Sequence, residues 1–149
     1  MKKQVDPHMH SVEHILNQAM GRRFACERCF SAHIERKKSK CDYRFDRPLT
    51  DEELTSLEKD VNAVIDADLP VTEHVISMVD ARKTYNLSRL PGDAGERIRI
   101  VCVGDYDRCP CIGPHVSSTR EIGRFRITSS GFEEGVLRIR FKLKRSAAR

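Results

Sequence analysis

Two short stretches that lie far apart in the chain carry side chains able to bind a metal ion. The first holds His10 and His14, and the second holds Cys111 and His115. In each pair the residues are four positions apart, a spacing that on a helix places both side chains on one face. Three imidazoles and one thiolate form a donor set that binds Zn²⁺ well in tetrahedral geometry. We therefore predict that the fold brings the two pairs together around a zinc ion, and that the metal marks the active site.

A zinc site made of four cysteines is an alternative ligand set. Cys26 and Cys29 form a Cys-x-x-Cys pair, and Cys109 with Cys111 forms Cys-Pro-Cys. Residues 24–34 have the pattern of a strand, however, in which positions three apart point to opposite faces. Both thiols of the first pair could bind one ion only if that strand broke, and no glycine or proline indicates a break. The four-cysteine site is therefore the less favoured hypothesis.

The first stretch is also compatible with a peptidase site. His10, Glu13 and His14 match the His-x-x-Glu-His pattern of inverted zinc peptidases, in which the glutamate activates water. Such a site needs a third ligand, usually a carboxylate further along the chain. It would leave Cys111 and His115 unused, so we favour the pairing of the two stretches.

Composition is that of an ordinary globular protein. The 149 residues fit a single domain spanning residues 1–149, and 39% hydrophobic and 33% charged residues are compatible with a core and a well-charged surface. The formal net charge of +5 is compatible with a polyanionic partner such as RNA, although charge alone is weak evidence.

The sequence pattern contains no targeting signal. No apolar segment follows the N-terminal Met-Lys-Lys, and no apolar run reaches the roughly 18 residues that span a membrane. We therefore expect a cytoplasmic protein without a membrane partner. Its six cysteines should be reduced, with Cys26 and Cys102 at core positions.

Helix and strand signals are interspersed along the chain. Asp6 and Pro7 are typical of a helix start, and Thr50 with Glu53 predicts a capping box at another. Helices are expected at 6–21, from 50 to before Pro70, and at 80–86; strands at 24–34, 41–45, 71–78, 98–103, 125–127 and 137–143; and a loop at 89–95. Most connections between strands are too short for parallel crossovers. The predicted fold class is α+β, with a mostly antiparallel sheet and helices packed on one of its faces.

The last predicted strand has one apolar and one basic face. The apolar residues Leu137, Ile139, Phe141 and Leu143 alternate with the basic residues Arg138, Arg140, Lys142 and Lys144. The basic face is either a solvated outer surface or a contact for a polyanion, and both interpretations also apply to the basic loop at 35–40. For contacts to an RNA backbone we favour a group of basic residues nearer the start of the chain: Arg22, Arg23, Arg36, Lys37, Lys38 and Lys40.

The two pairs and the segments between them resemble a known family. The combination of His10-x-x-x-His14 with Cys111-x-x-x-His115 is similar to the metal motif in the editing domain of alanyl- and threonyl-tRNA synthetases, in particular the free-standing alanyl-tRNA editing proteins of the AlaX type. Flanking segments agree in order and spacing along essentially the whole chain: 45–54, 61–62, 69–71, 99–101, 104–106, 111–116, 119–127 and 135–139. The resemblance implies the two-layer α+β fold of that family.

The resemblance also implies a trans-acting deacylase, which hydrolyses the ester between a wrong amino acid and the 3′-terminal adenosine of a tRNA. The aminoacylated 3′ end of tRNA would be its partner and Zn²⁺ its cofactor. The segment Cys111-Ile-Gly-Pro-His115 is similar to the threonyl type, whereas Glu121-Ile-Gly-x-Phe125 is similar to the alanyl type. Ser- or Gly-tRNA(Ala) is the expected substrate. The alternatives are Ser-tRNA(Thr), or a zinc-containing RNA-binding module without turnover.

Four further residues are candidates for the catalytic chemistry. Gly113 leaves room for a terminal ribose to approach the backbone closely. Glu13 is a polar group beside the proposed metal, and the resemblance implies that Ser31 and His33 line the amino-acid pocket. Ester hydrolysis needs an activated water and donors for the developing oxyanion, and the sequence leaves the identity of the general base open. Arg120 stands where the family usually has glycine.

Overall fold

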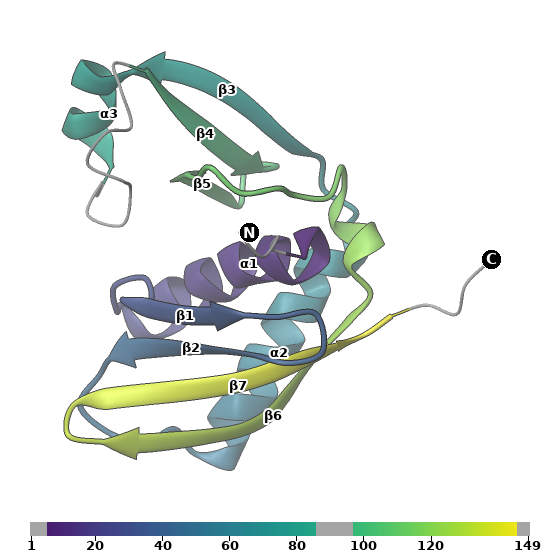
Figure 1. Cartoon of the computed structure of the whole chain (residues 1–149). Helices are drawn as coiled ribbons and strands as arrows, with labels where there is room; N and C mark the ends of the chain where they lie inside the picture. The colour runs from purple at the N-terminus through teal and green to yellow at the C-terminus, as the bar shows by residue number, and fades with distance from the viewer. Residues whose placement is uncertain (1–5, 86–96, 146–149) are drawn as a thin grey trace.

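The computed structural model describes residues 6–85 and 97–145, and its strands form two separate antiparallel sheets (Figure 1). The larger sheet has the strand order β1 (Ser31–Ile34), β2 (Ser39–Arg44), β7 (Val136–Lys144), β6 (Arg124–Glu133). The smaller sheet has the order β3 (Val71–Ser77), β4 (Arg97–Val103), β5 (Asp107–Pro110). The predicted α+β class and antiparallel pairing are confirmed, whereas the expectation of one sheet is wrong.

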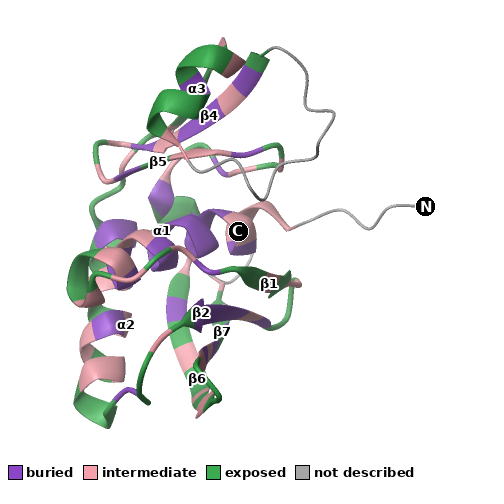
Figure 2. Cartoon of the chain, turned by 90° about the vertical axis from the view of Figure 1, so that its left-hand side faces the viewer, coloured by how far each residue is buried: buried purple, intermediate pink, exposed green. Residues whose placement is uncertain are grey.

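Helix α1 (Pro7–Phe24) explains the division into two sheets. Every residue from Ser11 to Asn17 is buried, so the helix is covered all round and not only along one stripe. The larger sheet lies on one side of α1 and the smaller sheet on the other (Figure 1, Figure 2). A helix buried to this extent needs a layer on each side, which one sheet with helices on a single face does not provide.

The two ends of α1 differ in how well local signals predict them. The start is as predicted, because the Asp6 carboxylate accepts a hydrogen bond from a backbone N–H of the first turn and proline occupies the first position. The predicted end near Gly21 is wrong, since the helix continues to Ala25, which caps it with a left-handed φ of 56°. The extra turn brings the Phe24 ring edge-on against Phe45, with centroids 5.6 Å apart.

The segment after α1 is mostly irregular. The sequence predicts a strand over 24–34, but only Ser31–Ile34 pairs, as β1. The left-handed Ala25 redirects the chain, and the Cys29 N–H then donates to the side chain of Asn17 in α1 at 3.2 Å instead of to a strand partner. Contact with the helix therefore replaces the ladder that the local pattern favours.

The remaining helices follow their capping signals. Helix α2 (Asp51–Asp66) starts with the predicted capping box at Thr50. Helix α3 (Met78–Thr84) starts two residues earlier than predicted. A short 3₁₀ turn that the pattern does not predict, η1 (Thr119–Ile122), precedes β6. The predicted loop at 89–95 lies outside the described residues.

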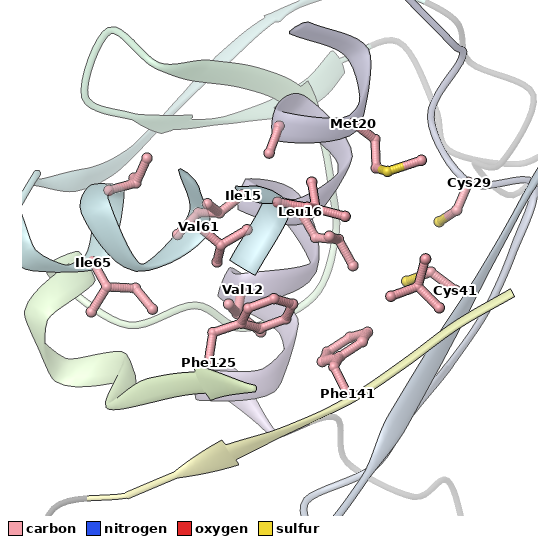
Figure 3. Packing of buried hydrophobic residues seen from close by; sticks show 14 of the residues in the cluster. Val12, Ile15, Leu16, Met20, Cys29, Cys41, Val61, Ile65, Phe125 and Phe141 are labelled. Atoms are coloured by element: carbon pink, nitrogen blue, oxygen red, sulfur yellow. The ribbon is translucent and has the colours of Figure 1, made fainter. Parts of the chain in front are cut away.

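The main core lies between the larger sheet and the helices α1 and α2 (Figure 3). The rings of Phe125 in β6 and Phe141 in β7 lie 5.3 Å apart between centroids, and they pack with Val12 of α1 and Val61 of α2. A second, smaller cluster around Ile100 joins β4 to α3. The packing against the larger sheet therefore fixes helix α1 in place, and the fixed helix positions its polar residues.

All six cysteines are free thiols. Cys26 and Cys102 are only partly buried and lie at the margins of the two clusters, so the expectation that they occupy core positions is wrong. Cys29 and Cys41 are the thiols that fill the main core. For Cys26 the difference follows from the irregular segment after α1, in which Cys29 and not Cys26 contacts the helix.

Candidate metal centre

The two predicted ligand pairs meet in the structure. His10 and His14 come from α1, Cys111 and His115 come from the loop after β5, and their ligand atoms all lie within 4.8 Å of one another. The Cys111 Sγ is 3.3 Å from His10 Nε2 and 3.4 Å from His115 Nε2. A tetrahedral zinc ion would hold a sulfur and a nitrogen ligand about 3.5 Å apart. The predicted convergence is confirmed, and the donor set and its spacing fit zinc.

The loop that carries the second pair is not helical, so other contacts must position it. Arg99 of β4 donates to the backbone carbonyls of Cys111 at 3.1 Å and of Gly113 at 2.7 Å. On the side of α1, the Ser11 hydroxyl accepts a hydrogen bond from the Val116 N–H at 3.1 Å. The smaller sheet and the helix therefore hold the loop from two sides.

Second partners orient two of the imidazoles. His10 Nδ1 lies 3.0 Å from the carbonyl oxygen of Pro114. Because a carbonyl oxygen only accepts, Nδ1 carries the proton and Nε2 presents its lone pair toward the sulfur of Cys111. His115 is arranged in the same way, with Nδ1 3.0 Å from the Ser11 hydroxyl and Nε2 facing the sulfur. The tautomer of His10 is thus the one that metal binding through Nε2 requires, and the ring of His115 is held with its Nε2 toward the same sulfur.

The third imidazole, His14, faces a buried carboxylate. Its Nδ1 lies 3.5 Å from Asp107 Oδ2, and Asp107 is 1% exposed. Arg28 donates to both oxygens of Asp107, at 2.8 and 3.2 Å, and the Gln18 amide donates at 3.0 Å. A carboxylate behind a metal-binding histidine orients the ring and raises its basicity. Asp107 was not predicted as a site residue, because its only signal in the sequence is its place just before the second ligand pair.

Electrostatics adapt the cluster to a metal cation. Burial alone would lower the pKa of His14, but the Asp107 carboxylate and the Cys111 sulfur raise it to about 9. Burial would raise the pKa of Asp107, yet His14 and Arg28 hold it at about 2. Burial would also raise the pKa of Cys111, and the surrounding imidazoles lower it to about 3. The thiolate, which is the ligand form of cysteine, is therefore stabilised at neutral pH.

Gly113 has a structural role that differs from the expected one. A Cβ at this position would lie 2.3 Å from His10 Cε1 and 2.6 Å from His10 Nδ1. We expected glycine to leave room for a ribose, but the imidazole of His10 fills that room. Any larger residue would push His10 away from the cluster.

Glu13 lies beside the cluster and is buried, with 4% of its surface exposed. Its Oε1 is 3.9 Å from His10 Nε2, and its Oε2 accepts from the Cys29 thiol at 3.4 Å. The structure thus brings this predicted site residue next to a ligand. It connects the metal cluster to the thiols on the sheet side of α1.

Ser31 and His33 are not brought to the cluster. Both are exposed on β1, whose alternate residues Ala32 and Ile34 pack against the core. Successive residues of a strand point to opposite faces, so Ser31 and His33 project from the outer face of the larger sheet. His33 there contacts Glu35, and neither residue belongs to the group of converging ligands.

The alternative set of four cysteines is not assembled among the described residues. The one other group of potential ligands in this part of the chain joins Glu13 to Cys29 and Cys41. It does not include Cys26 or Cys109, so the four-cysteine site is not formed, although Cys26 and Cys29 lie in irregular chain and not in the strand that we expected. Burial raises the pKa of Cys109 to about 11, which keeps it a neutral thiol.

Zinc is expected to stabilise the metal-free protein against heat. At a zinc concentration about 1,000 times the Kd the gain is about 4 kcal/mol, which raises the Tm of a domain of this size by roughly 8–16 °C. Zinc must displace the proton of His14, whose pKa is about 9, so the increase in Tm should grow as the pH rises from 6 to 8. Thermal unfolding with zinc, with magnesium as control and with a chelator measures it. An unchanged Tm with zinc, or an increase that shrinks with rising pH, would contradict the ligand assignment.

The fold and the four converging side chains define the chain as an α+β domain with a candidate metal centre. It belongs to the family of tRNA synthetase editing domains: residues 98–140 match the threonyl and alanyl tRNA synthetase second additional domain. The alanine–tRNA ligase of Idiomarina loihiensis is 33% identical over 143 residues, which cover 94% of this chain and 16% of the ligase.

Other alanine–tRNA ligases are similarly related. That of Coxiella burnetii is 36% identical over 133 residues, or 87% of this chain and 15% of the ligase. That of Aeropyrum pernix is 34% identical over 137 residues, or 89% of this chain and 15% of the ligase. The chain therefore spans about one sixth of the length of the curated relatives that it matches. None of the helices in the described residues is both long and apolar enough to cross a membrane.

Proposed function

We propose that the chain is an aminoacyl-tRNA deacylase that hydrolyses mischarged tRNA at a zinc centre held by His10, His14, Cys111 and His115. The meeting of these four residues from opposite ends of the chain is the main support. The relation to alanine–tRNA ligases favours tRNA(Ala) carrying serine or glycine as the substrate. We propose that the chain acts on the aminoacylated 3′ end of the tRNA and works in the cytoplasm, where aminoacyl-tRNA is used.

The chain's own residues would prepare the site in three ways. Asp107, Ser11 and the Pro114 carbonyl hold the three imidazoles in orientation. When bound, zinc supplies a Lewis acid that can polarise an ester carbonyl or a water. Glu13, the buried carboxylate nearest to the ligands, is proposed to accept or relay a proton beside His10. Gly113 serves by admitting the His10 ring.

Loss of a ligand is expected to abolish turnover. The His14→Ala variant should deacylate Ser-tRNA(Ala) at least 100-fold more slowly than the wild type, because it removes both a ligand and the partner of Asp107. The assay compares Ser-tRNA(Ala), Gly-tRNA(Ala), Ser-tRNA(Thr) and Ala-tRNA(Ala). His74→Ala, at an exposed histidine of β3, is the matched control and should keep full activity. If the zinc-loaded, folded wild type hydrolysed none of these substrates, the proposed activity would be excluded.

One observation favours a second candidate function. Four protein ligands fill the tetrahedral coordination of zinc, which is typical of structural sites, whereas catalytic sites keep a position open. A zinc-containing RNA-binding module without turnover would have this arrangement. The same four aminoacyl-tRNA substrates distinguish the two functions, since an RNA-binding module would bind tRNA and hydrolyse none of the esters. Hydrolysis confined to Ser-tRNA(Thr) would instead reassign the substrate.

A further inference from the structure

The outer face of the larger sheet carries a ladder of like charges. Residues directly opposite each other in an antiparallel pair project to the same side of the sheet. Three consecutive rows on the side away from α1 each hold two opposed cations: Lys144 and Arg124, Lys142 and Arg126, and Arg140 and Lys40. We call these six residues the outer basic face.

Most of these cations form no ion pair with the acidic residues of the described ranges. In the described part of the chain, none of Lys40, Arg126, Arg140, Lys142 and Lys144 forms an ion pair with an acidic residue. Arg124 pairs with Asp66 of α2 at 2.8 Å. In the row beyond Arg140, by contrast, Asp42 neutralises Arg138 at 2.8 Å. The Asp42 carboxylate also attracts Lys40 and Arg140 of the adjacent row, which help to lower its pKa without forming an ion pair with it. The positive charge is therefore least balanced at Arg126, Lys142 and Lys144.

Ordinary surface roles do not explain the ladder. Like charges directly opposite each other destabilise a sheet, and a solvated face would be equally soluble with stabilising Lys–Glu pairs. Cations protect edge strands from pairing with other chains, but β7, which contributes three of the six, lies between β2 and β6 (Figure 1). A bound polyanion would remove the repulsion.

We propose that the outer basic face binds the phosphate backbone of the tRNA, away from the metal centre. The inference rests on the proposed function for its choice of polyanion. Successive rows lie about 6.6 Å apart along β7, since a strand rises about 3.3 Å per residue, and they present repeated positive charge to a repeating phosphate chain. The sheet and helix α1 separate this face from the loop after β5 (Figure 1). The outer basic face therefore affects the affinity for tRNA and not the rate of ester hydrolysis.

The test compares two triple variants with the same change in net charge. Arg126→Gln/Arg140→Gln/Lys142→Gln removes three cations of the outer basic face, and Lys59→Gln/Arg82→Gln/Lys83→Gln removes three exposed cations of α2 and α3. Binding of uncharged tRNA(Ala) is followed by fluorescence anisotropy over a salt series. The first variant should bind at least tenfold more weakly at low salt. Its slope of log Kobs against log salt should be smaller by about 2–3, or about 0.7–0.9 per lost phosphate contact. Its Tm should be unchanged or higher.

Equal affinity and equal slope in the two variants would overturn the inference. So would a wild type that binds phosphatidylserine-containing vesicles but not tRNA. Deacylation of Ser-tRNA(Ala) is a separate readout, in which the first variant should raise KM and leave kcat unchanged. If the wild type deacylates while both variants bind alike, the inference fails and the proposed function stands. If the wild type lacks deacylase activity while the first variant loses tRNA affinity, the proposed function fails and the inference stands.

Discussion

Replacing Gly113 by alanine is expected to lower zinc affinity by about 100-fold or more and to abolish deacylation in parallel. The new methyl group would lie 2.3 Å from His10 Cε1, a distance that real Cβ atoms do not adopt. The His10 ring is held by the Pro114 carbonyl at 3.0 Å, and the loop is held by Arg99, so neither side yields easily. Titration of zinc against a chromophoric chelator measures the loss.

A control variant and a double-mutant cycle test whether Gly113 acts through His10. Gly131→Ala lies in β6 with nothing within 4 Å of the added Cβ, and it should leave zinc binding unchanged. In the His10→Ala background, Gly113→Ala should cause little further loss, because the methyl group then has no ring to displace. Additive losses, or a Gly113→Ala variant with the zinc affinity of the wild type, would show that Gly113 does not act through His10.

Asp107→Asn is expected to lower the free energy of unfolding by about 2–4 kcal/mol. It should also lower zinc affinity by about 10- to 100-fold. The Asp107 side chain is completely buried and neutralises Arg28, which is itself partly exposed. Asparagine keeps the shape but removes the charge that orients His14 and balances Arg28. Chemical denaturation measures the free energy of unfolding, and the zinc titration measures the affinity.

The same carboxylate makes stability depend on acid. The pKa of Asp107 is about 2 in the folded protein and about 3.9 in an unfolded chain. Its stabilisation is therefore complete above about pH 4 and is lost as the pH falls through 2, and Asp107→Asn should lack this part of the acid response. Asp60→Asn, which removes a carboxylate from the surface pair with Arg23, should cost less than about 1 kcal/mol. Equal losses in the two variants would exclude a special role for Asp107.

The sequence predicted correctly those helices and strands whose formation depends on residues close by in the chain. The caps at Asp6 and Thr50 act within one helical turn, so they form as the sequence indicates. The alternation in β7 also forms as predicted, since one apolar face needs only a core to cover it. Where a distant element competes, the prediction fails: the strand expected over 24–34 is shortened because Asn17 of α1 takes the Cys29 N–H.

The types of the four ligands and their two spacings are properties of the sequence, and they were sufficient to predict a metal centre and its donors. The tertiary structure alone decided what surrounds them. Asp107 lies behind His14, the His10 ring occupies the space left by Gly113, and Ser31 and His33 face outward. These relations join residues that are far apart in the chain, and they exist only because α1 is enclosed between two sheets. No local preference encodes such contacts, because they depend on how layers pack.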